Sequence, residues 1–322
     1  MKIVANEFIL PFVEGWQCHA SHFVTLKDGR IFAVWFYGSR EGKGDVRIYG
    51  TFRSPDGKWT FPAVPLSEDD GIPHWNPVLH RRSDGAIVLY YKVGETIADW
   101  YTKCRVSYDE AQTWSDSFEM VEGDRSGGRG PVRNKIVRLS DGSLLAGGST
   151  ERGEWKCFFD RSEDEGETWT RSRDLILSDA DLVGNRNKRG IIQPTIWESS
   201  QGVHALLRST ENLLFRTDSP DGIQWCDPYP TEIPHNNSGV DLVSLPDGRL
   251  ILACNPISTN ALRSPLSLMV SHDNGVHFEL LTHLSTGDGR FAYPALRYED
   301  GLLHVTYTWN RRTLQYLCLS DL

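Results

Sequence analysis

Long hydrophobic runs and closely spaced cysteines are both missing from this sequence, and each absence excludes a class of protein. No apolar stretch approaches the roughly 18 residues that a membrane-spanning helix requires, and residues 1–7 lack the apolar core of a secretory signal peptide. The six cysteines lie far apart, so no CxxC pair typical of zinc or redox sites is present. A chain of 322 residues is also large enough to fold without disulfide bonds. We therefore expect a reduced, cytoplasmic protein that does not associate with membranes.

Clusters of basic residues are missing as well. The chain has 34 Lys and Arg against 43 Asp and Glu, a net charge of −9, and its basic residues are scattered rather than gathered in runs. Binding to nucleic acid requires a basic face, so we expect no nucleic-acid partner. The histidines show no HxxxH or HExxH spacing, and no glycine-rich phosphate loop is present. We expect neither a metal site nor a cofactor.

A repeated hairpin signal is what the sequence does contain. Short runs rich in β-branched and aromatic residues, such as residues 23–26 and 30–35, flank a turn that ends in glycine. Asp-Gly between two such runs is a strong signal for a tight β-hairpin. The signal occurs six times, with Gln replacing Asp once, at Asp28-Gly29, Asp84-Gly85, Asp141-Gly142, Gln201-Gly202, Asp247-Gly248 and Asp300-Gly301.

A polar turn motif, Ser-x-Asp-x-Gly-x-x-aromatic, alternates with these hairpins. Complete and altered copies begin at Ser54, Ser107, Ser162, Ser219 and Ser271. We expect their Ser and Asp side chains to bond backbone groups within the turn, which assigns the motif to the scaffold rather than to catalysis. Two interleaved motifs that recur about every 54 residues predict an all-β fold, a six-bladed β-propeller that forms a single domain over residues 1–322. Pairing of the N-terminal strand, around residues 8–10, with the C-terminal strands would close the ring.

Polar residues occupy the positions where the inner strand of each predicted blade begins, next to the central axis. They are His19, Trp75, Asn76, Arg133, Asn134, Lys135, Gln193, Asn236, Asn237, Ser238 and Tyr293. The strand after each hairpin returns to the same mouth and ends at Arg40, Lys92, Glu151, Arg208, Asn255 and Arg311. Amides suit sugar hydroxyls, arginine binds a carboxylate through two parallel hydrogen bonds, and tryptophan offers an apolar face to a sugar ring. This funnel favours a ligand with a terminal acidic sugar.

Several of these passages resemble the sialidase superfamily, in its branch of BNR-repeat or Asp-box proteins. The resemblance covers essentially the whole chain and is carried by residues 18–45, 75–79, 130–135, 192–194, 237–241 and 291–311, together with the turn motif, the Asp-box. Sialidases use three arginines that bind the sugar carboxylate, a Tyr nucleophile with a Glu beside it, and an Asp acid/base. The resemblance places the tyrosine at Tyr293, the aspartate at Asp45, and two of the arginines at Arg208 and Arg263.

Two positions depart from that pattern. His19 stands where the first arginine is expected, and Gln193 stands where the glutamate is expected. A phenol with a pKa near 10 is a poor nucleophile unless a neighbouring base removes its proton, and glutamine cannot do so. A histidine with a near-neutral pKa could act as general acid or base instead.

Three functions fit the sequence. The first is an exo-acting glycosidase that cleaves a terminal sialic or uronic acid, with Asp45, Tyr293 and His19 as catalytic residues. Its substrate-binding residues would be Arg40, Trp75, Asn76, Lys92, Asn134, Lys135, Gln193, Arg208, Asn237, Arg263 and Arg311. The second is a uronate-dependent lyase of the rhamnosyl-glucuronate type that uses His19 and Tyr293. The third is a non-catalytic glycan-binding propeller. In each case we expect a monomer, because closure of the ring leaves few exposed strand edges.

Overall fold

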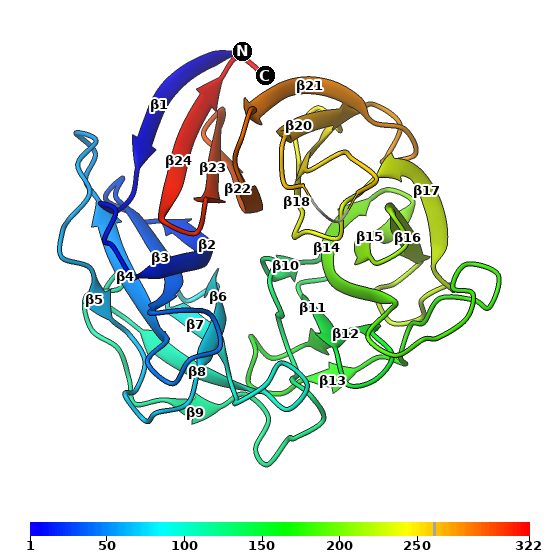
Figure 1. Ribbon diagram of the computed structural model, residues 1–322, viewed down its shortest axis with the longest axis horizontal. Helices are drawn as coiled ribbons and strands as arrows, with labels where there is room; N and C mark the ends of the chain where they lie inside the picture. Colours follow the sequence, from blue (N-terminus) through cyan, green and yellow to red (C-terminus); the bar gives the residue numbers. More distant parts are fainter. Residues whose placement is uncertain (260–261) are drawn as a thin grey trace.

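The computed structural model describes residues 1–259 and 262–322 and shows a ring of six antiparallel sheets (Figure 1). The described residues form 24 strands and no helix, and each sheet contains four strands. Each sheet is one blade, and the blades follow one another around a central axis in chain order. The predicted six-bladed β-propeller is therefore confirmed.

The first three blades run from the axis outward in sequence order. They consist of β2 (Gln17–Thr25), β3 (Ile31–Gly38), β4 (Arg47–Arg53) and β5 (Val64–Pro65) in blade 1; β6 (His74–Arg81), β7 (Ile87–Val93), β8 (Tyr101–Ser107) and β9 (Phe118–Glu119) in blade 2; and β10 (Val137–Arg138), β11 (Leu144–Thr150), β12 (Lys156–Ser162) and β13 (Thr170–Arg171) in blade 3.

Blades 4 and 5 are built in the same order, whereas blade 6 takes its outer strand from the N-terminus and so is made from both ends of the chain. Blade 4 contains β14 (Ile191–Ser199), β15 (Gly202–Ser209), β16 (Leu213–Ser219) and β17 (Tyr229–Pro234); blade 5 contains β18 (Asp241–Ser244), β19 (Leu250–Cys254), β20 (Leu266–Ser271) and β21 (Glu279–Ser285); and blade 6 contains β22 (Phe291–Glu299), β23 (Leu302–Trp309), β24 (Thr313–Ser320) and β1 (Lys2–Phe8). Strand β1 pairs with β24, so the two termini lie side by side (Figure 1).

Apolar side chains fill the space between neighbouring blades. Between blades 3 and 4, for example, Phe159 of β12 stacks on Trp225 with ring centroids 3.7 Å apart, next to Leu145, Val203 and Leu207. All five are buried. Burial of each large apolar side chain contributes about 1.5–3 kcal/mol, so the ring is held together mainly by these interblade cores.

The Asp-boxes are turns closed by their own side chains. In the copy at Ser162, the hydroxyl accepts a hydrogen bond from the Gly166 amide (2.8 Å) and donates one to Asp164 (2.7 Å). Asp164 accepts from the Thr168 amide (2.9 Å), and the Trp169 indole donates to the Gly166 carbonyl (3.0 Å). Because these groups satisfy one another, the motif has a scaffold role in this structure.

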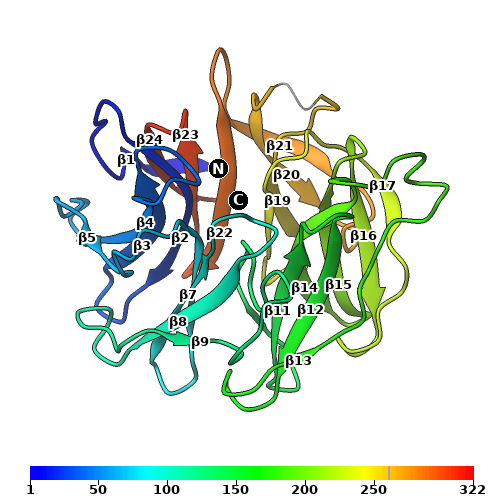
Figure 2. The same ribbon diagram turned by 60° about the horizontal axis from the view of Figure 1, so that its bottom comes forward.

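A backbone irregularity recurs where the inner strands begin. The register shifts within β2, β6, β14 and β22, and each shift contains a residue with positive φ: Ala20 (56°), Asn76 (43°), Gln193 (54°) and Tyr293 (58°). Asn237, just before β18, has a φ of 53°. A β-bulge re-aims the side chain that it carries, and these bulges lie at the mouth of the axis. Strand β22 runs from this mouth across the ring (Figure 2).

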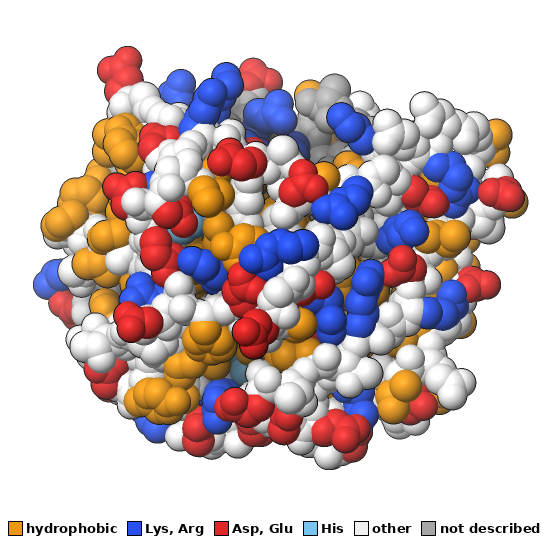
Figure 3. All heavy atoms as spheres, turned by 90° about the horizontal axis from the view of Figure 1, so that it is seen from below, with side chains coloured by type: hydrophobic (Ala, Val, Ile, Leu, Met, Phe, Trp, Pro, Cys, Tyr) orange, Lys and Arg blue, Asp and Glu red, His pale blue; other side chains and the backbone are white. Residues whose placement is uncertain are grey.

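Charges on the outside of the ring are mixed in sign. Figure 3 shows acidic and basic side chains interspersed over one face of the molecule. All six cysteines are free thiols, and only Cys226 is exposed. In the part of the chain that the structure describes, there is no helix long and apolar enough to cross a membrane.

Candidate functional site

Tyr293, at the start of β22, is the centre of the group of polar side chains at the mouth. Its hydroxyl accepts a hydrogen bond from Nη1 of Arg208 (2.8 Å) and lies 3.5 Å from Nε2 of Gln193. Arg208, near the end of β15, also donates to Oε1 of Gln193 (2.9 Å) and to Oδ1 of Asn237 (2.8 Å). Two residues of blade 4 thus hold the Tyr293 hydroxyl of blade 6, and the structure brings these four predicted residues together.

Three arginines surround the Tyr293 ring. The guanidinium carbons of Arg133, Arg208 and Arg263 lie 5.2, 5.8 and 5.7 Å from its centroid. Within residues 1–259 and 262–322, none of the three forms an ion pair with a carboxylate. Nη2 of Arg208 also has no hydrogen-bond partner among those residues. This concentration of unneutralised positive charge suits an anionic ligand.

These arginines change the acidity of the tyrosine. Burial alone would raise the pKa of Tyr293, but the charges of Arg208 and Arg263 outweigh burial, and the pKa is lowered although Glu41 opposes them. The phenol therefore loses its proton more readily than an ordinary tyrosine does. Gln193 cannot act as a base, and the arginines supply part of the activation that a glutamate would provide.

His19 packs against Tyr293, with ring centroids 4.1 Å apart. Its Nδ1 bonds to the Thr308 hydroxyl (2.8 Å), and its buried Nε2 has no hydrogen-bond partner among the residues that the structure describes. The pKa of His19 lies well below its usual value, first because the ring is buried and then because Arg311, Arg263, Arg133 and Arg208 repel a positive charge. At pH 7 the imidazole is therefore uncharged. The acid–base role expected from the sequence depends on a pKa close to 7, and the surroundings of His19 do not provide one.

Two glutamates, neither of them among the predicted site residues, lie near this group. Glu41 forms an ion pair with Arg311 and acts electrostatically on Tyr293. Glu151 follows β11 directly, and burial raises its pKa; Arg208 opposes this rise and Glu41 adds to it. The sequence placed Glu151 at the mouth, at a strand end like Arg208, but it was not selected as a site residue. A carboxyl group that keeps its proton to higher pH is suited to donate that proton.

Asp45 and Arg40 lie on the exposed loop before β4. The Asp45 carboxylate accepts hydrogen bonds from the backbone amide and the hydroxyl of Ser39 (2.9 Å each). Its slight burial would raise the pKa, but these hydrogen bonds outweigh burial and lower it. Asp45 therefore holds this loop in shape, and its lowered pKa is the opposite of the raised pKa that suits a proton donor.

Trp75, another predicted residue, lies against Gly42 of the same loop. Its indole donates to the Gly94 carbonyl (3.1 Å).

Three further predicted residues connect blades, and a fourth, Lys92, bonds within blade 2 and to the segment that follows it. Asn76 donates to the Val132 carbonyl (3.0 Å), and Asn134 donates to the Pro194 carbonyl (2.9 Å). Lys135 reaches from blade 3 to Asp241 in blade 5 (2.7 Å). Lys92 donates to the Thr102 hydroxyl (2.7 Å) and to the Arg129 carbonyl (2.6 Å), and burial lowers its pKa to about 7. In this structure these side chains bond to the protein itself, so substrate binding by them stays a prediction.

Arg133 is a residue that sequence reasoning placed at the mouth but did not select. It is fully buried, and its Nη2 crosses the axis to donate to the carbonyls of Tyr293 (2.6 Å) and Pro294 (2.9 Å). Asp241 accepts hydrogen bonds from Thr195 (3.0 Å) and from the Leu296 amide (2.8 Å). The Arg133 bonds reach from blade 3 to blade 6 and the Asp241 bonds join blade 5 to its two neighbours, so together they hold β22 in place next to Tyr293.

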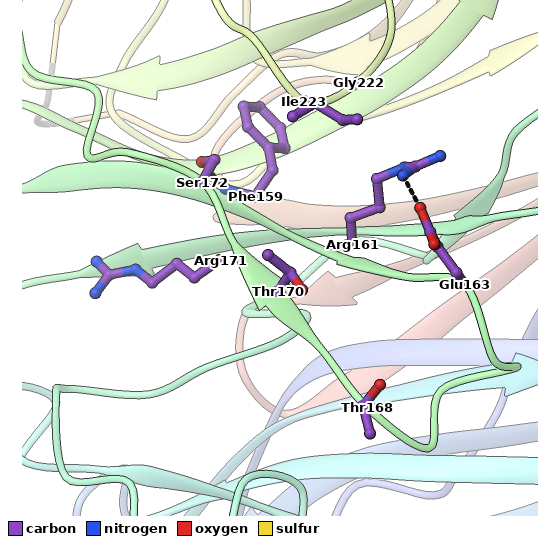
Figure 4. Close-up of a pocket in the computed structure, with 9 residues that line it drawn as sticks. All are labelled: Phe159, Arg161, Glu163, Thr168, Thr170, Arg171, Ser172, Gly222 and Ile223. Carbon is purple, nitrogen blue, oxygen red and sulfur yellow. Dashed lines mark hydrogen bonds and ion pairs between the residues drawn. The ribbon is translucent and has the colours of Figure 1, made fainter.

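A pocket of about 280 Å³ lies elsewhere, between blades 3 and 4 (Figure 4). Its walls include Phe159, Ile223 and the ion pair of Arg161 with Glu163, and none of the predicted site residues lines it. The convergence of charged groups at Tyr293, rather than the shape of this pocket, identifies the candidate site.

A six-bladed ring of Asp-box repeats with arginines around an axial tyrosine is a sialidase-like β-propeller. Residues 29–305 match the family model described as a BNR repeat-like domain, and the chain belongs to this family. The resemblance stated from the sequence is thereby confirmed.

Solved structures share the fold at low sequence identity. A protein of unknown function from Dyadobacter fermentans is 15% identical, with a TM-score of 0.78 over 99% of both chains. The Hadza microbial sialidase Hz136 is 14% identical, with a TM-score of 0.76 over 94% of this chain and 66% of that chain. Trypanosoma rangeli sialidase, solved with the inhibitor DANA, is 13% identical, with a TM-score of 0.69 over 94% of this chain and 55% of that chain. No curated protein matches the sequence.

Proposed function

We propose that the protein is an exo-acting glycosidase that binds a terminal acidic sugar at Tyr293 and cleaves its glycosidic bond. The observation that carries this proposal is the convergence of Arg208 and Arg263 on Tyr293 without a carboxylate partner among the described residues. Buried positive charge is costly unless it is paired. A sugar carboxylate would supply the missing charge, and Arg208 Nη2 would be one of its donors. The sialidase-like fold supports the same reading.

Tyr293 would attack or stabilise the anomeric carbon in this reaction. Its lowered pKa increases the fraction of phenolate, the form that acts as nucleophile. The leaving oxygen needs a proton. Asp45 is the donor that the family pattern predicts, and Glu151, whose pKa is raised by burial, is the second candidate for this role. His19, neutral and with Nε2 unpartnered, would bond a substrate hydroxyl.

A lyase acting on a uronic acid glycoside is the second candidate, and one observation favours it. Among residues 1–259 and 262–322, no carboxylate is hydrogen-bonded to the Tyr293 hydroxyl, which accepts from Arg208 and Gln193 instead. A phenolate held in this way could remove the C5 proton of a uronate whose carboxylate the arginines neutralise. Hydrolysis and β-elimination leave different products, so the two candidates separate experimentally.

The test is turnover of matched glycosides with product analysis. The wild-type protein would be incubated with 4-methylumbelliferyl N-acetylneuraminide, with the corresponding glucuronide, with a rhamnosyl-glucuronate disaccharide and with a neutral glucoside. We expect cleavage of an acidic glycoside and none of the glucoside. A saturated product identifies a glycosidase, and an ultraviolet-absorbing 4,5-unsaturated uronate identifies a lyase. Binding of an acidic sugar without turnover would leave only the glycan-binding alternative.

A further inference from the structure

A second hydrogen-bonded chain of catalytic side-chain types lies at the opposite end of blade 4. Ser199, the last residue of β14, places its Oγ 2.9 Å from Nε2 of His204 on β15. Nδ1 of the same imidazole lies 2.5 Å from Oδ1 of Asp218 on β16. Gln193, at the Tyr293 site, is six residues earlier on β14, about 20 Å away at the rise of an extended strand. The two sites are therefore separate.

We propose that Ser199, His204 and Asp218 form a second catalytic site, which hydrolyses short acyl esters. Serine, histidine and aspartate in this order of hydrogen bonds form the arrangement that activates a serine hydroxyl as a nucleophile on unrelated folds. Two groups face His204 Nδ1: Oδ1 of Asp218, which only accepts, at 2.5 Å, and Nη2 of Arg216, which only donates, at 3.1 Å. The nearer carboxylate and the Asn274 amide, which donates to Nε2 (3.1 Å), both favour the proton on Nδ1. Nε2 is then left to accept the proton of Ser199.

The surroundings hold this chain in place. Burial would raise the pKa of Asp218, but hydrogen bonds from His204, Tyr229 and Arg216 lower it to about 2, so the carboxylate is ionised at neutral pH. The His204 side chain is buried, and its ring lies 5.1 Å from that of Trp197. The imidazole therefore keeps one edge toward Asp218 and the other toward Ser199.

Two donors stand beside the nucleophilic oxygen. The Gln201 amide lies 3.0 Å from Ser199 Oγ, and Nδ2 of Asn274, from the Asp-box of blade 5, lies 3.1 Å from it. The Asn274 amide is oriented because its Oδ1 accepts from the Trp197 indole (2.8 Å). Both amides donate to Oγ itself, so they hold the nucleophile in place and leave its own O–H directed at His204 Nε2.

Substrate could reach this serine from solvent. Ser199, Gln201 and Asn274 line a pocket of about 690 Å³ between blades 4 and 5. Leu245 and Leu250 provide apolar wall, while Arg249 and His272 provide polar wall. An acyl chain of a few carbons on a polar alcohol fits such a lining, which commits the proposal to short acyl esters.

The reaction balances without a cofactor. Ser199 Oγ bonds to the acyl carbon as its proton passes to His204 Nε2, and the alcohol leaves with that proton when its bond to the acyl carbon breaks. Water then gives a proton to His204 and attacks the acyl-enzyme. The carboxylic acid is released, and the proton returns to Ser199.

The first test labels the wild-type protein with a fluorophosphonate probe, which phosphonylates activated serines with loss of fluoride. We expect one adduct per chain, located by peptide mass spectrometry at Ser199. Absence of an adduct at Ser199 under conditions that label a known serine hydrolase would overturn the proposal. This measurement does not depend on the folding of any variant.

The second test measures hydrolysis of p-nitrophenyl acetate by matched variants. Ser199→Ala is expected to lower kcat/KM about 100-fold or more, while Ser200→Ala, next to it in the hairpin turn, stays within about twofold of wild type. For the positioning residue, Asp218→Asn is expected to lower kcat and leave KM in place, because an amide does not hold the tautomer of His204. A Ser199→Ala variant that melts like Ser200→Ala and hydrolyses the ester at the wild-type rate contradicts the proposal.

Discussion

Replacement of Arg208 tests the proposed recognition of a carboxylate most directly. This side chain holds Tyr293, Gln193 and Asn237 through three hydrogen bonds of 2.8, 2.9 and 2.8 Å, and it is 7% exposed. Truncation of one partner of a buried, hydrogen-bonded charge pair costs about 2–5 kcal/mol. Arg208→Ala should therefore weaken the binding of an acidic sugar by roughly 30-fold to several thousand-fold.

The comparison of ligands makes this prediction specific. Isothermal titration would compare N-acetylneuraminate or glucuronate, whichever binds, with its methyl ester, which keeps the sugar ring and lacks the charge. Arg208→Lys keeps the charge but loses the planar pair of donors, so its affinity should fall between wild type and the alanine variant. Arg312→Ala, on the exposed turn before β24, is the matched control and should bind like wild type. Equal losses for the acid and its ester in Arg208→Ala would refute carboxylate recognition by this arginine.

Three further predictions concern the tyrosine, the proton donor and a buried lysine. Tyr293→Phe should lower kcat about 100-fold or more while ligand affinity changes little; unchanged turnover would exclude Tyr293 from the chemistry. Glu151→Gln should reduce kcat/KM far more for a sugar bound to an alcohol than for one bound to a phenol, because only the poor leaving group needs the proton; if Asp45→Asn shows this pattern instead, Asp45 is the donor. Lys92 has a pKa near 7 when folded, against about 10.4 when unfolded, so between these values the unfolded chain binds more protons and stability rises with pH. Urea unfolding would be measured from about pH 7 to about pH 10. Over this range the free energy of unfolding of the wild type should rise by a few kcal/mol relative to that of Lys92→Met. A difference that stays constant with pH would mean that burial does not disfavour the charged form of Lys92.

The repeat made the fold predictable from sequence. Each Asp-Gly or Gln-Gly turn marks the junction between the first two strands of a blade, as Asp28-Gly29 does between β2 and β3. A hairpin signal and a closed polar turn depend on neighbouring residues only, so both can be read without knowledge of the tertiary structure. Blade number then followed from the spacing.

The candidate site was predictable only in part. The positions of Tyr293, Arg208, Gln193 and Asn237 near one another followed from their places at strand starts and ends. Side-chain direction did not follow, because a bulge of one residue exchanges the two faces of a strand. Lys92 illustrates the difference: it sits at a strand end as Arg208 does, yet its ammonium group bonds to Thr102 and the Arg129 carbonyl.

The electrostatic environment of the titratable side chains could not be predicted from the sequence either. The pKa of Glu151, in blade 3, depends on burial and on Arg208 and Glu41, which come from two other blades. The same holds for His19, whose nearby arginines are spread over residues 133–311. The electrostatic effects of residues that lie far apart in the sequence can be added up only when their positions in space are known.

The non-glycine residues with positive φ at the mouth of the axis add backbone strain to this part of the ring. A non-glycine residue in that conformation costs about 1–2 kcal/mol, and a bulky aromatic such as Tyr293, at a φ of 58°, is among the least tolerated there. Glycine in place of Asn76, Gln193 or Tyr293 would relieve the backbone strain but would remove the polar side chain. The contacts of these side chains offset that strain: Tyr293 is buried and packs on His19, and Asn76 donates to the Val132 carbonyl. The ring therefore tolerates local backbone strain where it holds polar side chains at its centre.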